Sequence, residues 1–458
     1  MTLAFRSDET SPFVRALFAD QGIAPGEVPL EIDGRDEMLE FLLSCCEGDR
    51  ERALFTYFRS GLSIAETLVQ VLRGRFGDLG RIERLMDFAC GYGRVTRFLL
   101  RHFPDDPAPA ERVWVSDVYA DAVRFQEERF GVHGIVSTIV PEDFSCEERF
   151  DAILVTSLFT HLPEERFVGW LRRLLGLLRP GGILVWSVHD EAVRDPGLAM
   201  PETGFLFQEL SESNTLETSD YGSTWVTEEF VRSALERAAE GPVSLWRAPR
   251  GLCNFQDLYV AARDVRGEAA DVSGLTVHPE PLLMIDRCVL ERPDLLALSG
   301  WCAVRGGRPR EVQASLDGRI VAGSPIEGLR PDVAAALGDE RLARSGWGLR
   351  VPLPAGTSRH AAPLIVRVVD ERGAGHPLWA GSVETALLAT ARQDIDVLRR
   401  GLDQLRARLA ESEARAAAEI AGRDARIAAM EASRFWKLRN AWFRLKGSLG
   451  FGDPARRG

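Results

Sequence analysis

The chain of 458 residues lacks several features that would place it in a membrane or in an oxidising compartment. No apolar run reaches the roughly 20 residues of a membrane-spanning helix. The first residues show neither the apolar core nor the small-residue cleavage site of a secretory signal. Its seven cysteines are odd in number, scattered, and without the spacing of zinc ligands. We therefore expect a cytoplasmic protein with reduced thiols and no bound metal.

Positive charge is also scarce, with 56 Lys and Arg residues against 68 Asp and Glu residues and a formal net charge of −12. Because nucleic-acid binding needs a basic surface that neutralises phosphates, this balance argues against a nucleic-acid partner. The length predicts two or three domains.

A short apolar run at residues 85–89 is followed by two closely spaced glycines, Gly91 and Gly93, and then by a helix-period pattern over residues 95–103. This order predicts a strand, a tight turn and a helix. A nicotinamide or flavin site would require a third glycine where this chain has Thr96, which makes the dinucleotide interpretation weak. An acid, Asp87, lies four residues before Gly91.

A second apolar run, residues 112–117, ends in Asp117, which lies 26 residues after Gly91. An acid at the end of the second strand can bind both hydroxyls of a ribose through its two oxygens. The alternative is that Asp117 caps the helix that follows, and both roles can coexist.

The third signal covers residues 150–188. A buried strand (152–155) is followed by a polar loop (156–161), and an amphipathic helix begins at Pro163. We expect Pro180-Gly181-Gly182 to end this helix and residues 183–188 to form the next strand. Residues 133–140 are expected to form a third strand, and residues 243–246 and 257–262 would complete a seven-stranded sheet.

Taken in order, these segments resemble the class I S-adenosylmethionine-dependent methyltransferases. Their first motif runs acid-x-Gly-x-Gly-x-Gly, with Ala89 here at the first glycine, and their later signature matches Phe150-Asp151, Ser157-x-Phe159-x-His161-Leu162 and Leu178-x-Pro180-Gly181-Gly182. The resemblance implies an α/β Rossmann-like fold with S-adenosylmethionine as cofactor. Asp117 would take the ribose, and Ser157, Phe159 and His161 would border the methyl group. The remaining cofactor-binding residues would be Asp87, Ala89, Cys90, Gly91, Tyr92, Gly93 and Arg94.

Two histidines are the catalytic candidates. His161 either orients its loop by hydrogen bonding or lines the cofactor or acceptor site. His189 follows the fifth strand and is a candidate general base for an acceptor hydroxyl, or else a surface histidine. The long insertion at residues 190–226 suggests a lid in which Tyr221 and Trp225 face a substrate or pack within the lid itself.

The domain plan has six parts: a helical lead-in (1–80), the methyltransferase core (81–264), a linker (265–275), a β-sandwich (276–385), a coiled coil (386–432) and a basic aromatic tail (433–458). In relatives the lead-in helices lie over the cofactor pocket; here they could simply pack on the sheet. The sandwich resembles accessory β domains of bacterial glycan-assembly enzymes at Gly300-Trp301, Arg330-Pro331-Asp332-Val333 and Ser345-Gly346-Trp347. It could bind sugar or act only as a spacer or dimer module.

Residues 395–409 carry apolar side chains at alternating spacings of three and four, the heptad pattern of a coiled coil. We expect a homo-oligomer; a single helix folded back on the sandwich is the alternative. The tail has five basic residues and no acid over residues 433–446. It could contact the inner face of a membrane, dock a partner enzyme such as a glycosyltransferase, or form the last turns of the coiled coil.

The function we expect is methyl transfer from S-adenosylmethionine to a hydroxyl of a sugar or polysaccharide. Methylation of a small natural product is one alternative. A non-catalytic scaffold of a glycan-assembly complex is another, and Ala89 in place of glycine is the feature that favours it.

Overall fold

The computed structural model describes residues 11–103, 108–210, 213, 215–263, 271–305 and 307–448. Residues 1–10, part of the predicted linker (265–270) and the end of the predicted tail (449–458) lie outside the described residues. The chain divides into two compact units, Met1–Leu387 and Leu388–Gly458. The methyltransferase-like and β-rich parts thus share one unit, and the predicted boundaries between them stay predictions.

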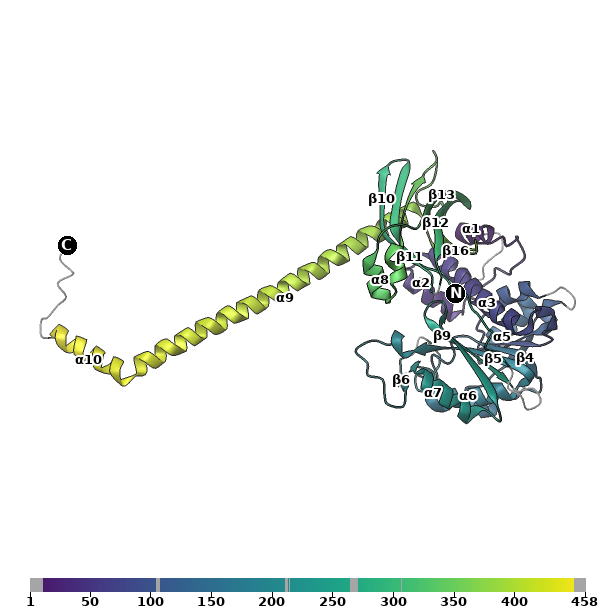
Figure 1. The fold of residues 1–458 in the computed structure, drawn as a ribbon, viewed down its shortest axis with the longest axis horizontal. Helices are drawn as coiled ribbons and strands as arrows, with labels where there is room; N and C mark the ends of the chain where they lie inside the picture. The colour runs from purple at the N-terminus through teal and green to yellow at the C-terminus, as the bar shows by residue number, and fades with distance from the viewer. Residues whose placement is uncertain are drawn as a thin grey trace. The chain divides into compact units, whose positions relative to one another are not determined.

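A nine-stranded sheet forms the centre of the first unit (Figure 1). The seven predicted strands run in the spatial order β3-β2-β1-β4-β5-β9-β8, with the first five parallel and β9 antiparallel to its neighbours. This is a Rossmann-like arrangement in which the chain order reverses beside β1. The strands are β1 (Leu85–Phe88), β2 (Val113–Asp117), β3 (His133–Val136), β4 (Phe150–Val155), β5 (Leu178–Asp190), β8 (Val243–Leu252) and β9 (Gln256–Arg263).

The other two strands were not predicted. They are β6 (Phe205–Gln208) and β7 (Ser223–Val226), which form an antiparallel hairpin within the long insertion. The hairpin joins the sheet because His189 and Asp190, at the end of β5, pair with Trp225 and Val226. The insertion is therefore anchored to the sheet at the edge where the parallel strands end.

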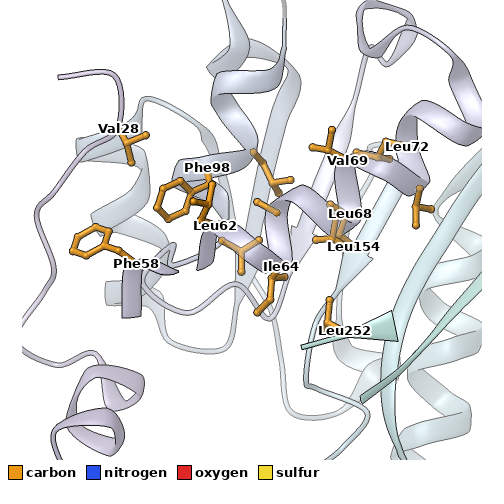
Figure 2. Close-up of a cluster of buried hydrophobic side chains, with 14 of the residues drawn as sticks. Val28, Phe58, Leu62, Ile64, Leu68, Val69, Leu72, Phe98, Leu154 and Leu252 are labelled. Carbon is orange, nitrogen blue, oxygen red and sulfur yellow. The ribbon is translucent and has the colours of Figure 1, made fainter. Parts of the chain in front are cut away.

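Helices cover both faces of this sheet because successive residues of its strands point to opposite sides. Leu85 faces a core with α3 (Arg50–Phe76) and α4 (Thr96–Leu99), whereas Met86 faces a core with α6 (Glu164–Gly176) and α7 (Glu228–Ala238). Figure 2 shows the first core, in which side chains of α3 meet Phe98 and Leu154. Two buried layers of this kind hold the strand ends in fixed positions.

Three local predictions need correction. The helix after the glycine turn is one α-turn, Thr96–Leu99, continued by a 3₁₀ turn, Leu100–His102. α6 ends at Gly176, because Leu178 already pairs with Phe150 across an irregular stretch of β5 that contains Pro180. The third strand ends at Val136, because Ser137 then donates from its backbone to Asp117 and a 3₁₀ turn begins at Pro141.

The β-rich part consists of two antiparallel sheets around one apolar core. The first has the order β10 (Leu282–Arg292), β11 (Leu295–Ala303), β14 (Gly346–Pro352). The second has the order β13 (Arg319–Pro325), β12 (Pro309–Leu316), β15 (Leu364–Asp370), β16 (Gly375–Gly381). Asp317-Gly318 forms the hairpin turn between β12 and β13, with φ of 48° and 75°. The short helix α8 (Pro331–Leu337) was not predicted.

Two helices precede α3, namely α1 (Pro12–Asp20) and α2 (Glu37–Cys45). An ion pair of 2.7 Å joins Asp20 of α1 to Arg367 of β15 and ties the β-rich part to the lead-in helices. α5 (Ala120–Phe130) follows β2.

The long helix α9 (Val383–Ala432) begins with Val383 and Ala386 in the core of the sandwich and then continues into the second unit. Its expected pairing into a coiled coil stays a prediction. α10 (Arg434–Ser448) follows after one non-helical residue. Within the described ranges, none of the helices combines the length and apolar character needed to cross a bilayer.

Candidate active site

A cavity of about 680 Å³ opens at the carboxyl ends of β1, β2 and β4. The glycine turn after β1, the loop after β2 and the loop after β4 all contribute to its wall. Ligands of open α/β sheets bind at this edge, beside the point where the strand order reverses. The volume lies in the range of small-molecule sites.

The glycine turn keeps the backbone that the sequence predicts, including at the alanine. Ala89 has a φ of 57°, Gly91 of 52° and Gly93 of 77°, so all three residues are left-handed. Gly91 lines the cavity, and a side chain added there would meet nothing within 4 Å, so bare backbone faces open space. A side chain on Gly93 would overlap the ring of Phe130 at 2.3 Å. The turn therefore tolerates alanine at position 89 at a conformational cost.

A buried arginine that the sequence gave no reason to select holds this turn from behind. Arg97 is 1% exposed, and its guanidinium donates to the carbonyls of Gly93 (2.9 Å), Tyr92 (3.3 Å) and Pro29 (3.0 Å). From the other side, α3 approaches so closely that a side chain on Gly61 would lie 2.2 Å from the carbonyl oxygen of Arg94. The turn is thus fixed between α3 on one side and, through Arg97, the segment around Pro29 on the other.

Asp117 lies at the end of β2 on the cavity wall and is 6% exposed. Its two carboxylate oxygens accept hydrogen bonds from the backbone of Gly91 (2.8 Å) and Tyr119 (3.0 Å). Burial raises its pKa, and the backbone donors of Tyr119, Gly91 and Val118 act in the opposite direction. Each oxygen keeps a second lone pair, so the carboxylate can still accept a hydrogen bond from a ligand. The capping alternative is wrong, because the N-cap of α5 is Tyr119 and no side chain caps this helix; the bond from Tyr119 to Asp117 lies before it.

Asp87 is fully buried at the floor of the cavity. Burial raises its pKa to about 7; the hydroxyl of Thr96, which donates to it at 2.7 Å, lowers the pKa, and nearby Asp117 raises it. The residue that replaces the third glycine of a dinucleotide motif therefore binds the acid of this turn. Cys90, Tyr92 and Arg94 also line the cavity, and Arg94 donates to Ser60 of α3 at 2.8 Å.

Of the predicted residues after β4, the structure brings Ser157 and His161 to the cavity but not Phe159. Ser157 has a φ of 64°, and its backbone N–H donates to Ser187 at 2.8 Å. Phe159 is fully buried and packs against Phe167 and Trp186 at centroid distances of 4.8 and 6.4 Å. It supports the loop from the core.

His161 is joined to the insertion by three contacts. Its Nδ1 lies 2.7 Å from the carbonyl oxygen of Gly222, which can only accept, so Nδ1 carries the hydrogen. The backbone N–H of Gly222 donates to the carbonyl of His161 at 2.8 Å. The ring of Tyr221 stacks on the imidazole with centroids 4.4 Å apart and planes 17° apart. These contacts show that His161 orients its loop; it also lines the cavity, and its place beside the cofactor or acceptor stays a prediction.

His189 is half-buried behind this loop and is not one of the residues on the cavity wall. Its ring lies 5.1 Å from that of Phe255, 6.2 Å from that of Trp225 and 6.4 Å from that of His161. Burial, and secondarily His161, lower its pKa to about 4. A weak base away from the cavity is poorly placed to accept a proton there.

The sequence did not identify the residues that cover the cavity opposite the sheet. Asp36 caps α2 and accepts a hydrogen bond of 2.6 Å from Tyr57. The next residue, Glu37, accepts from the insertion residues Ser213 (3.4 Å) and Thr215 (3.3 Å). The hydroxyl of Tyr119 lies within 3.1 Å of both of these insertion residues. The N-cap signal at Asp36 was visible in the sequence, but its place beside the cavity was not.

The residues on the cavity wall fit S-adenosylmethionine as a ligand. A buried carboxylate with accessible lone pairs suits ribose hydroxyls, and bare backbone at Gly91 allows close approach of a ligand. Among the described residues, no group of three or more His, Cys, Asp and Glu could hold a metal ion; metal independence stays a prediction.

Sheet order, glycine turn and terminal acid together define a Rossmann-like methyltransferase fold. Residues 86–184 match a family model described as a methyltransferase domain. Over these residues the chain therefore matches a methyltransferase domain, and the site indicates S-adenosylmethionine as the cofactor.

Individual relatives are distant. A trans-aconitate 2-methyltransferase from Rhodopseudomonas palustris (strain BisB18) is 27% identical over 122 residues, which is 27% of this chain and 44% of that protein. The chain thus spans less than half of this curated relative. A sugar N-methyltransferase from Streptoalloteichus sp. is 17% identical with a TM-score of 0.34, covering 44% of this chain and 88% of that one. An O-methyltransferase family protein from Burkholderia thailandensis is 18% identical with a TM-score of 0.34, covering 57% and 74%.

Proposed function

We propose that this chain transfers a methyl group from S-adenosylmethionine to a hydroxyl group of a sugar or polysaccharide. The observation that carries the proposal is the Asp117 carboxylate, which is bonded to the Gly91 backbone and lies on the wall of a 680 Å³ cavity. Bound S-adenosylmethionine supplies an electrophilic methyl group, so the main contribution of the protein is to position the acceptor in line with it.

In this proposal the residues divide the cavity into two sides. Asp117 binds the ribose hydroxyls, and Asp87 supports the glycine turn from below. The turn residues on the cavity wall hold the methionine side by backbone contacts: Ala89, Cys90, Gly91, Tyr92 and Arg94. Ser157 and His161 border the reacting methyl group, and Phe159 and Gly93 act through packing. Arg97 keeps the turn in place through its bonds to the carbonyls of Tyr92 and Gly93.

His161 is the residue that we propose as the base for the acceptor hydroxyl. Its Nδ1–H donates to Gly222, so in the neutral imidazole Nε2 is the basic nitrogen. Moving the acceptor proton to Nε2 would make the oxygen nucleophilic. The new carbon–oxygen bond would form as the methyl–sulfur bond of the sulfonium breaks, with S-adenosylhomocysteine as the leaving group. His189 retains a supporting role beside Phe255 and Trp225.

A paired substitution separates the two histidines. We expect His161→Asn to lower kcat by about 100-fold or more, within the range for loss of a general base. His189→Asn should leave kcat within about three-fold of the parent. The reverse order of effects would transfer the role of base to His189.

A sugar acceptor is supported by the polar groups on the covering side of the cavity. Ser213, Thr215, Tyr119, Glu37 and Asp220 offer hydroxyls and carboxylates there, and Tyr221 offers an aromatic face beside them. Hydroxyl and carboxylate groups match the hydrogen-bonding capacity of a polyol. The carboxylates of Glu37 and Asp220 on this side would disfavour an acidic acceptor beside them.

The test is methyl transfer from labelled S-adenosylmethionine to a panel of neutral sugars, with sugar acids of the same ring size as matched controls. We expect transfer to neutral members and little or none to the acids. Preferential methylation of the acids would contradict the assignment of the acceptor.

We further propose that α9 associates with a second copy of the chain. Ile395, Leu398, Leu402, Leu405 and Leu409 are all exposed along this helix at alternating spacings of three and four. Sedimentation equilibrium of the full chain tests this proposal: a monomer at all concentrations would contradict it.

A further inference from the structure

The helix α10 differs in charge from the rest of the protein. Between Arg434 and Lys446 it carries five basic residues and no acidic residue. The complete chain has a net charge of −12, and without these five charges it would have −17. The positive charge of α10 is therefore opposite in sign to the net charge of the rest of the chain.

Large apolar side chains lie exposed on the same short helix. Phe435 is 76% exposed, Leu438 71% and Trp442 63%, and Leu445 is also exposed. At about 100° per residue, positions 435, 438, 442 and 445 fall on one face of an α-helix. Within the described residues this face has no covering partner in the second unit.

The arginine at the centre of the helix is held among aromatic rings. The guanidinium of Arg439 lies 4.3 Å from the centroid of Trp436 and 5.4 Å from that of Phe443. An arginine that lies over aromatic rings keeps its charge while its stem and the rings form a shared apolar surface. Arginine and tryptophan of this kind suit the boundary between lipid headgroups and acyl chains.

The chain also separates α10 from the long helix before it. α9 ends at Ala432, and the hydroxyl of Ser433 accepts a hydrogen bond from the backbone of Trp436 at 3.2 Å, as a new N-cap does. Since Arg434 would fall near the seam if the apolar repeat of Ile427 and Met430 continued, α10 is not a simple extension of a coiled coil.

We propose that α10 docks in the plane of an anionic lipid bilayer. Phe435, Leu438, Trp442 and Leu445 enter the headgroup boundary, and the basic residues bind acidic headgroups. Charge complementarity favours this occupant over a second copy of the helix, since two copies would bring like charges together. Self-association through α9 would double the number of docking helices and strengthen binding without new contacts.

The experiment measures co-sedimentation of the full chain with vesicles of phosphatidylcholine alone or with 30% phosphatidylglycerol. We expect partitioning to be at least about ten-fold stronger on the anionic vesicles and to weaken in 0.5 M salt. Replacing all five basic residues of α10 by Gln should remove this preference. Leu438→Ser with Trp442→Ser should weaken binding while leaving the charge unchanged.

A matched control removes the same charge from α9. Its substitutions are Arg399, Arg406, Arg408, Arg415 and Arg423, each to Gln, and we expect them to leave vesicle binding within about two-fold of the parent. Equal loss of binding in both sets would overturn the proposal, because any loss of positive charge would then suffice. Failure of the parent chain to bind either vesicle would also overturn it.

Discussion

Replacing Asp117 by Asn tests the centre of the cofactor site with a change of one atom. The carboxylate accepts from Gly91 and Tyr119 through different oxygens, at 2.8 and 3.0 Å. An amide keeps only one acceptor oxygen, so its NH₂ group must face the backbone N–H of either Gly91 or Tyr119. The substitution therefore removes the charge and leaves one of these two backbone donors without its acceptor.

The expected magnitude follows from the strength of such bonds. A hydrogen bond to a charged group contributes about 1.5–3 kcal/mol, and leaving a buried donor without a partner costs a similar amount. We therefore expect S-adenosylmethionine to bind about 100-fold more weakly, which corresponds to about 3 kcal/mol. Because Asp117 also organises the turn, thermal unfolding without ligand should accompany the titration.

Isothermal titration of S-adenosylmethionine into parent and variant is the assay. Asp121→Asn is the matched control, because Asp121 also lines the cavity but is half exposed and paired with Arg35 and Arg124. We expect its affinity to stay within about three-fold of the parent. An Asp117→Asn variant that folds normally and binds with unchanged affinity would refute the ribose assignment.

Three further predictions address the same region. Ala89→Gly should raise the free energy of unfolding by about 0.5–1 kcal/mol, since Ala89 is left-handed at φ 57°; a lower melting temperature would contradict this. Burial raises the pKa of Asp87 to about 7, so between pH 4 and 7 the folded state binds more protons than the unfolded state and stability falls as pH rises. Asp87→Asn should therefore gain stability over the parent by up to about 4 kcal/mol across this range in urea titrations, and parallel curves would count against it. Gly222→Ala should lower kcat by about ten-fold without changing cofactor affinity. The added side chain would lie 2.2 Å from the carbonyl oxygen of Gln208 and would displace the Gly222 carbonyl that accepts from His161. An unchanged kcat would show that this hydrogen bond does not contribute to catalysis.

The sequence predicted the strands and the glycine turn because their signals are local. An apolar run followed by Gly91 and Gly93 specifies a strand and a turn over fewer than ten residues. The same holds for Asp117, whose place at the end of β2 follows from the apolar run before it. The glycine turn and Asp117 make up most of the part of the cavity wall that we assign to the cofactor.

Features that depend on contacts between distant segments could not be predicted from the sequence. Arg97 reads as a surface arginine in sequence, yet it is buried against carbonyls of the lead-in and the turn. Phe159 matches a family signature, but its side chain packs in the core. His189 was expected to follow the fifth strand, but it lies within β5 and pairs directly with Trp225 of the insertion hairpin. Each outcome depends on segments far apart in the chain.

The central claim is that this chain binds S-adenosylmethionine in the cavity at the end of β1 and β2. Its most direct test is calorimetric titration of the purified full chain with S-adenosylmethionine, with NAD as the control ligand. We predict binding in the micromolar range for S-adenosylmethionine and none for NAD. Absence of S-adenosylmethionine binding at millimolar concentration would contradict the account and favour a non-catalytic scaffold.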